Sequence, residues 1–203
     1  MKLLFGLPGF ILAAAVQALQ PEEDGRDALA LGRALASLGR RAEAGAAFQK
    51  GAQAPAATEW EALLARARCE RALGFFERAA KSLVAADEAA RARKTRSSSE
   101  PDVLIELGDV YFETYGEVDD AVSKAHSPGE LCKEALGLHR DHAGARILLW
   151  RLHRWNWQRT SQSPDEILET LFAAHPDSIE GLLARASGGL DDGELPGARR
   201  TLE

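Results

Sequence analysis

Aromatic residues make up only 6% of this 203-residue chain, and no stretch alternates apolar and polar residues for long enough to be a β-strand. β-Branched residues are also scarce. Alanine, leucine, arginine and glutamate, which lose little rotamer freedom in a helix, are abundant. Positive charge is not in surplus either, because 25 Lys and Arg face 31 Asp and Glu. The composition therefore predicts an all-α protein and argues against nucleic acid as its main ligand, since phosphate binding requires a basic surplus.

Cysteine is nearly absent. Cys69 and Cys132 lie far apart, with no CxxC motif and no histidine at metal-ligand spacing. We interpret both as buried free thiols, and a disulfide between them is the alternative. The one close histidine pair, His139 and His142, lacks a cysteine or carboxylate at a fixed helical offset that would complete a zinc site. No metal site is expected.

Sequence motifs of catalysis are missing as well. The chain has no GxSxG, P-loop, GxGxxG or HExxH sequence. The acidic turn at 191–193 lacks the alternating ligand spacing of a calcium loop. We therefore expect neither enzymatic activity nor a cofactor.

The first 18 residues have the pattern of an export signal. Lys2 precedes an apolar run from Leu3 to Val16, and small residues at Val16 and Ala18 suit cleavage after Ala18. The run is short for a bilayer span and contains Pro8. A signal peptide is the favoured interpretation, and the chain is expected in the periplasm or outside the cell. An uncleaved anchor or an apolar helix packed on the fold is the alternative.

A spacing of small and apolar residues then repeats along the chain. Four glycines are followed by such residues five and nine positions later: Ala44 and Phe48 after Gly39, Ala79 and Leu83 after Gly74, Ala121 and Ala125 after Gly116, and Ala198 and Leu202 after Gly193. Glycine commonly ends a helix. Gly39 and Gly74 are 35 residues apart, close to the period of helical-hairpin repeats. The pattern predicts a series of helical pairs.

The residues of the first unit resemble a tetratricopeptide repeat. The matching positions are Leu31-Gly32-x-x-Leu35, Ala44-x-x-x-Phe48 and Pro55, with Leu107-Gly108-x-x-Tyr111 similar in the third unit. The second unit departs from the family, with Ala67 where glycine is frequent and Glu70 where a large apolar residue is usual. The resemblance implies an α-solenoid of antiparallel helix pairs that winds into a right-handed superhelix. It also implies that partners bind in a concave groove lined by the first helix of each pair.

Breaks in the pattern divide the chain. After the signal, residues 19–93 form two helical pairs, 94–100 a linker, and 101–203 further pairs, about five pairs in all. Three Ser/Thr-x-x-Glu sequences, at 58–61, 127–130 and 163–166, predict helix starts with capping boxes. The last pair is expected to be incomplete, so the chain is interpreted as a fragment or the first part of a longer array.

Positions on the predicted groove carry arginine. Counting from the small residue at each helix crossing places five of them on the inner wall, with Asp109 as the exception: Arg33, Arg68, Arg71, Arg151 and Arg154. Arginine grips carboxylates through two hydrogen bonds. One hypothesis is therefore that the groove binds an acidic segment or a C-terminal carboxylate. The other interpretation, which we favour from sequence, is a solvated face paired with nearby Glu and Asp.

Aromatic residues concentrate at Trp150, Trp155 and Trp157. Trp150 and Trp157 share a face if the helix continues through both. Core packing is the favoured interpretation and a ligand groove the alternative.

Together these features predict an exported, non-catalytic scaffold whose groove binds a protein or peptide partner. The alternative is the non-catalytic repeat region of an exported enzyme, such as a zinc peptidase, in which the repeats position substrate.

Overall fold

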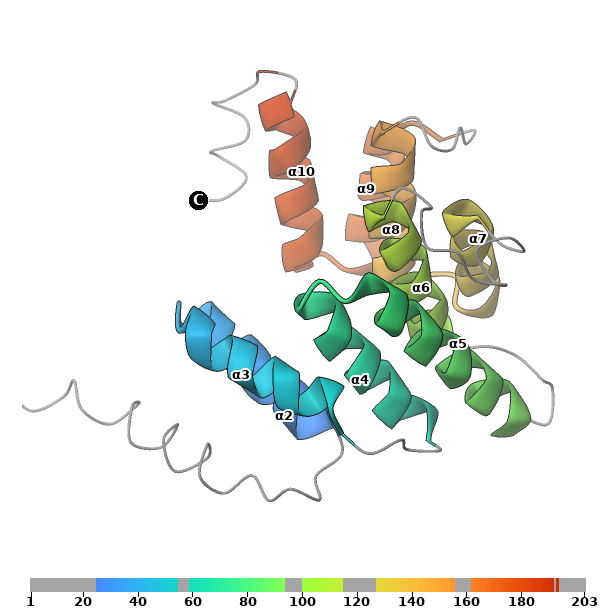
Figure 1. Cartoon of the computed structure of the whole chain (residues 1–203). Helices are drawn as coiled ribbons and strands as arrows, with labels where there is room; N and C mark the ends of the chain where they lie inside the picture. Colours follow the sequence, from blue (N-terminus) through green and yellow to red (C-terminus); the bar gives the residue numbers. More distant parts are fainter. Residues whose placement is uncertain are drawn as a thin grey trace, which may run out of the picture. The chain divides into compact units, whose positions relative to one another are not determined.

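The computed structural model describes residues 25–54, 59–93, 100–114, 127–155, 162–191 and 193. Every regular element in these ranges is a helix (Figure 1). The helices are α2 (Gly25–Ser37), α3 (Arg41–Ala52), α4 (Trp60–Ala72), α5 (Phe76–Arg93), α6 (Pro101–Glu113), α7 (Pro128–Leu138), α8 (Ala143–Arg154), α9 (Pro164–Ala174) and α10 (Ile179–Asp191). The predicted signal peptide, most of the predicted linker and the predicted last helix lie outside the described residues.

The helices form two compact units, Met1–Thr95 (unit 1) and Arg96–Glu203 (unit 2), which divide within the segment predicted as a linker. In unit 1, α2 packs against α3, α4 packs against α5, and α4 also contacts α2 and α3. In unit 2, α6 packs on α7 and α8 on α9. Helix α8 also contacts α6 and α7, and α10 contacts α8 and α9.

Each unit therefore stacks the first helices of its pairs side by side. We call these helices row A, which is α2 and α4 in unit 1 and α6, α8 and α10 in unit 2. Three residues separate α4 from α5, so the two packed helices run antiparallel. The predicted all-α fold of antiparallel helix pairs is confirmed. The right-handed superhelix stays a prediction, and so does the second helix expected within 101–126, which falls outside the described residues.

Glycines end the helices as expected. Gly39, Gly74 and Gly193 have φ of 74°, 77° and 78°, in the left-handed region that favours glycine. Gly116 lies outside the described residues. Five positions after the first two glycines, Ala44 and Ala79 are buried, so the repeated offset marks packing positions.

The helix crossing in the first pair is also as the pattern predicts. A Cβ added at Gly32 would clash with the ring of Phe48, so the absence of a side chain lets α2 and α3 approach. Leu35 and Ala47 are buried beside this contact. Helix α2 ends at Ser37, and the Leu38 side chain after it is 61% exposed.

A serine caps the helix at two of the three predicted capping boxes, and the complete box forms at one of them. The Ser163 hydroxyl accepts a hydrogen bond from the backbone N–H of Glu166, whose carboxylate accepts one from the N–H of Ser163. The Ser127 hydroxyl accepts a hydrogen bond from the backbone N–H of Glu130 and so caps α7. The box expected at 58–61 begins at Thr58, which lies outside the described residues; α4 begins at Trp60, and Glu59 before it makes no side-chain capping bond.

Glu70, the departure from the family pattern, is fully buried between α4 and α5 of unit 1. Its carboxylate lies 3.2 Å from Arg66 Nε and 3.2 Å from an Arg78 nitrogen, and it accepts a 2.7 Å hydrogen bond from the Ser82 hydroxyl. A buried charge is tolerated only when it is paired in this way. The position that usually packs an apolar side chain here holds an ionic cluster.

None of the helices in the described ranges is both long and apolar enough to cross a lipid bilayer.

Candidate functional site

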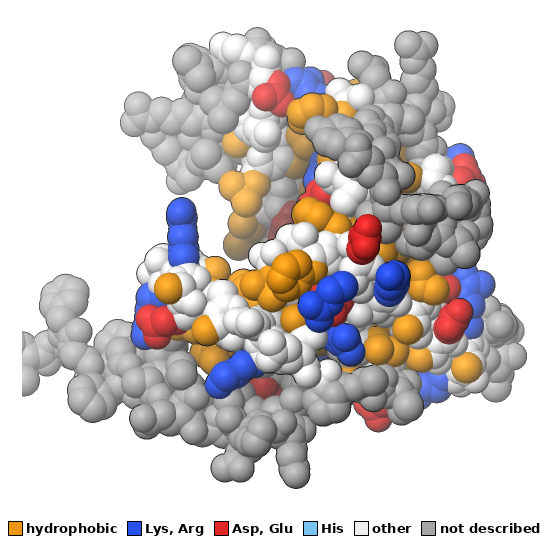
Figure 2. Space-filling view, in the orientation of Figure 1, with side chains coloured by type: hydrophobic (Ala, Val, Ile, Leu, Met, Phe, Trp, Pro, Cys, Tyr) orange, Lys and Arg blue, Asp and Glu red, His pale blue; other side chains and the backbone are white. Residues whose placement is uncertain are grey.

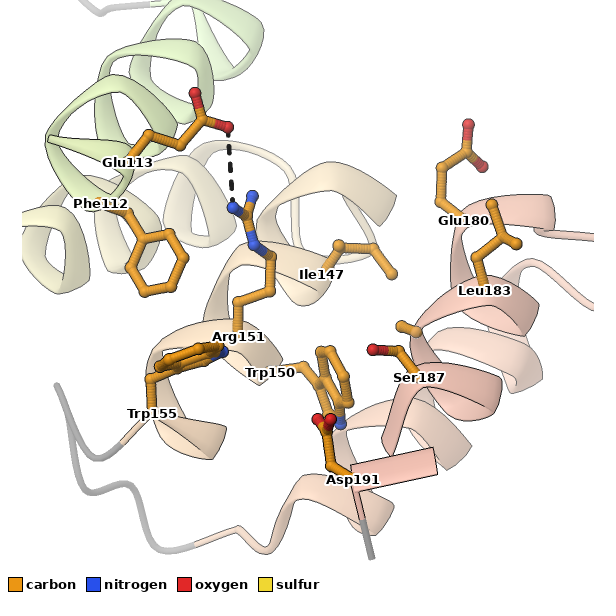
Figure 3. Close-up of a pocket in the computed structure, with 11 residues that line it drawn as sticks. Phe112, Glu113, Ile147, Trp150, Arg151, Trp155, Glu180, Leu183, Ser187 and Asp191 are labelled. Carbon is orange, nitrogen blue, oxygen red and sulfur yellow. Dashed lines mark ion pairs between the residues drawn. The ribbon is translucent and has the colours of Figure 1, made fainter. Parts of the chain in front are cut away.

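The first candidate site is a cavity of about 630 Å³ in unit 2, open between the row A helices α6, α8 and α10 (Figure 3). We call it the aromatic cavity. It is lined by Phe112, Glu113, Ile147, Trp150, Arg151, Trp155, Glu180, Leu183, Ala184, Ser187 and Asp191. The lining is mainly aromatic and aliphatic, with charged groups among the apolar walls.

Two tryptophans of the α8 region form one wall. Trp150 is 7% exposed and packs in the core, while one face of its indole borders the cavity. Trp155 follows the last residue of α8 and is 61% exposed. Figure 3 shows the two rings on either side of the Arg151 stem. Trp150 is therefore a core residue, as favoured from sequence, and it also borders a cavity. Helix α8 ends at Arg154, and Trp157 lies outside the described residues.

Helix α10 forms the opposite wall, and its glycines set how closely it approaches. A Cβ at Gly188 would lie 3.3 Å from Trp150 Cζ2, tighter than an ordinary contact. A Cβ at Gly181 would lie 2.8 Å from Leu171 Cδ2 of α9. These glycines let α10 lie against both neighbours. Leu183, on the cavity side, stays 55% exposed.

Arg151 is the one cation among the lining residues that the structure describes, and it contacts groups of its own unit. Its guanidinium donates a 2.6 Å hydrogen bond to Asp109 Oδ1 and lies 3.7 Å from Glu113 Oε1. It also stacks over the Phe112 ring, 4.6 Å from its centroid. The two acids come from α6, so the contacts join neighbouring row A helices. Arg154 points elsewhere and donates a 3.2 Å hydrogen bond to the carbonyl of Gly188.

The second candidate site is a smaller cavity of about 280 Å³ on row A of unit 1. We call it the arginine pocket. It lies between α2 and α4 and is lined by Arg26, Leu29, Ala30, Arg33, Trp60, Glu61, Leu64, Ala65 and Arg68. Three arginines face one glutamate there. Figure 2 shows Lys and Arg side chains scattered among hydrophobic ones over the helices of unit 1.

The five arginines predicted for the groove are thus distributed over both units. Arg33 and Arg68 line the arginine pocket, and Arg151 lines the aromatic cavity. Arg71 is half-buried at the end of α4 and lines neither cavity. Three of the five predicted arginines thus line a cavity, and their place on a binding groove stays a prediction. The sequence prediction did not include the apolar lining residues Leu183 and Ile147.

The histidine pair serves as a helix cap. His142 precedes α8, and its Nδ1 accepts a 3.2 Å hydrogen bond from the backbone N–H of Ala145. Its Nε2 then donates to Asp102 Oδ1 at 3.1 Å, a tautomer that follows from the bond at Nδ1. The His139 ring lies edge-on to it. Within the described ranges, no three His, Cys, Asp or Glu side chains come together as metal ligands.

No protein-family model matches the chain, and no curated protein matches it significantly. Among solved structures, one similar chain is YrrB, described as a TPR protein with an unusual peptide-binding site. The match has 12% sequence identity and a TM-score of 0.42, and it covers 94% of this chain and 88% of that one.

Proposed function

We propose that this chain is a tetratricopeptide-like interaction scaffold that binds a peptide segment of a partner protein on row A. The observation that carries the proposal is the aromatic cavity, about 630 Å³ in volume and lined mainly by apolar side chains. Sites that bind small ligands and peptide side chains are concave and mostly apolar, with volumes of roughly 300 to 1,000 Å³. The cavity is of this kind.

Exposed apolar side chains around the cavity support the same function. Trp155 and Leu183 are more than half exposed on its walls, and Ile179 is 68% exposed in the first turn of α10. Leaving large apolar groups in water forgoes the free energy that their burial would release. A bound segment that covers them recovers it.

The acidic partner predicted from sequence belongs to unit 1 in this proposal. Arg33 and Arg68 line the arginine pocket, and Arg71 lies one turn beyond Arg68 on α4. Substituting Arg68→Glu and Arg71→Glu together is expected to weaken capture of an acidic peptide by unit 1. Unchanged capture would rule out this part of the proposal.

Export through residues 1–18 and the absence of catalysis are part of the same proposal. The first is supported by the Lys2-plus-apolar pattern and the second by the lack of catalytic motifs. Mass spectrometry of the mature N-terminus, with cleavage expected after Ala18, tests the first.

A phage-displayed library of random peptides, selected on the full chain, tests peptide binding. We expect enriched peptides that lose at least about tenfold in affinity, or about 1.4 kcal/mol, with Leu183→Asp. The matched control is Leu138→Asp, which alters an exposed leucine of the same unit that does not line the cavity. Circular dichroism checks that both variants stay helical. Peptides that bind the Leu183 variant as well as the wild type would contradict the proposal.

A further inference from the structure

We propose that the aromatic cavity of unit 2 selects a basic segment, in which an apolar side chain is flanked by Lys or Arg. The inference rests on the proposed function and adds the chemical class of the ligand. It is opposite in sign to the acidic partner that the five arginines suggest from sequence alone, and it applies to unit 2 only.

The charges of the cavity carry the inference. Among the described residues, its lining contains three carboxylates, those of Glu113, Glu180 and Asp191, against one guanidinium, that of Arg151. Arg151 is already paired with Asp109 at 2.6 Å and with Glu113 at 3.7 Å. An incoming carboxylate would have to displace these partners. An incoming cation meets a surplus of negative charge instead.

Stacking strengthens this preference. The Arg151 guanidinium already occupies the face of Phe112. The indole of Trp155, mostly exposed, also lines the cavity (Figure 3). A ligand Lys or Arg that lies over an indole face gains cation–π attraction, about 0.5 to 1 kcal/mol at an exposed site. The aromatic side chains and the carboxylates of the lining thus both favour a positively charged ligand.

The spacing of the two acids on α10 sets the length of the ligand. Glu180 and Asp191 are eleven residues apart, about three turns, so they share a face about 16 Å apart along the axis. An extended segment covers that distance with about five residues at about 3.3 Å each. Leu183 and Ser187 lie between the two acids. Figure 3 shows Glu180 near Leu183 at one end and Asp191 beside Trp150 at the other.

The expected ligand therefore has two basic residues about five positions apart, with a large apolar residue between them. The apolar side chain would enter among Leu183, Trp150 and Ile147, and each basic group would reach one acid of α10. A second copy of this chain is a poorer match on charge, because the chain carries a net charge of −6.

Three synthetic peptides test the charge preference on the full chain. They share one apolar centre, taken from the library selection, and carry Lys, Ser or Glu at both flanking positions. Fluorescence anisotropy of labelled peptides measures affinity. We expect the Lys peptide to bind at least about tenfold tighter than the Glu peptide at low salt, with the difference shrinking as salt screens the charges. Equal affinities, or tightest binding of the Glu peptide, would overturn the inference and leave the proposed function standing.

A double variant of the acids on α10 tests their role. Glu180→Gln with Asp191→Asn is expected to reduce the Lys-over-Glu preference to about threefold or less. The matched control, Glu77→Gln with Glu88→Gln, removes the same charge from exposed positions of α5 in unit 1 and should leave the preference unchanged. A preference that survives in the α10 variant would overturn the inference.

Two further outcomes separate the levels of the proposal. If the library yields no binding peptide, or if the enriched peptides bind the Leu183→Asp variant as tightly as the wild type, the proposed function itself fails. If sedimentation shows a concentration-dependent dimer that Leu183→Asp dissolves, the occupant is a second copy, and the basic-segment inference is wrong.

Discussion

In each unit the row A helices pack side by side and border a cavity, but the two cavities are lined by different charged residues. Counting described residues only, the arginine pocket of unit 1, about 280 Å³ in volume, is lined by three arginines and one glutamate. The aromatic cavity of unit 2, about 630 Å³ in volume, is lined by three carboxylates and one paired arginine on the same count. The helix pairs therefore decide where a site lies, and the residues between the packing positions decide what it binds.

The interiors differ as well. In unit 1 the buried residues are largely alanines, together with the fully buried Glu70. In unit 2 they are larger, among them Tyr111, Leu107, Leu148 and Ile167. Burial of larger apolar side chains releases more free energy. Unit 1 therefore depends more on its ionic cluster, and unit 2 more on its apolar core.

The largest effect on this contrast is expected from Glu70→Ala. The change leaves the buried Ser82 hydroxyl unpaired and separates Arg66 and Arg78 from their carboxylate. Removing one partner of a buried ion pair costs 3–5 kcal/mol, and we expect about 3 kcal/mol, because Arg78 is half exposed and reaches water. Urea unfolding measures the loss.

Amide hydrogen exchange assigns the loss to a unit. Protection should fall in α4 and α5 and stay unchanged in α6 to α9. Glu70→Gln, which can still pair with Ser82, should cost less, and the exposed Glu77→Ala should cost within about 0.5 kcal/mol. Equal loss of protection in both units would contradict the interpretation that unit 1 depends more than unit 2 on the ionic cluster for its stability.

Local features of the chain were predictable from sequence. The helix ends at Gly39 and Gly74 were predictable because they depend on one glycine with a positive φ. The capping box of Ser163 and Glu166 was predictable because it forms within a single helical turn. The inner position of Arg151 followed from helical spacing. Its partner did not, because Asp109 is 42 residues away and only the packing of α6 on α8 brings the two together.

The character of each cavity depended on such long-range packing. Nothing in the sequence indicated that Leu183 and Trp155 line one cavity, since this depends on the approach of α10 to α8 at Gly188. Nor did the sequence reveal that Glu70 is buried, because its three partners come from two helices. The helical period in the sequence identifies which residues share one face of a helix. Which of their charges are paired depends on the neighbouring helices, and the sequence does not show this.

A smaller effect, of the same kind in both units, is expected from the two cysteines in alkali. Burial raises the pKa of the Cys69 thiol from its ordinary 9.0 to about 11, partly offset by the positive charge of Arg33, and that of Cys132 to about 12. Both thiols are neutral in the folded state below these values. Their contribution to stability is thus complete below about pH 9 and is lost as pH rises toward 11 and 12.

Within that window each thiol should cost about 1.4 kcal/mol of stability per pH unit. Comparing the slope of unfolding free energy between pH 8 and 10 in wild type and Cys69→Ser isolates one thiol from the lysines and tyrosines that titrate nearby. Alkylation by iodoacetamide at rising pH should modify Cys69 of unit 1 before Cys132 of unit 2. The reverse order, or fast labelling of both at pH 8, would show that the thiols are not protected as the structure places them.

The smallest effect concerns how helices begin in the two units. In unit 2, Ser127 and Ser163 supply side-chain caps, whereas in unit 1 the residue before α4, Glu59, makes none. Ser163→Ala should cost about 1 kcal/mol. Glu59→Ser should stabilise unit 1 by less than that, because it also removes the exposed ion pair with Arg26.

Thermal unfolding followed with hydrogen exchange measures both changes in the unit concerned. Ser127→Ala is the internal comparison, since its cap lacks the reciprocal bond that Glu166 provides at Ser163, so its cost should be the smaller of the two. If Glu59→Ser stabilises unit 1, the start of α4 is destabilised by the lack of a capping side chain at position 59. If it destabilises unit 1, the Arg26–Glu59 pair at the edge of the arginine pocket is worth more than a cap. The extended backbone before α4 would then be set by that pair.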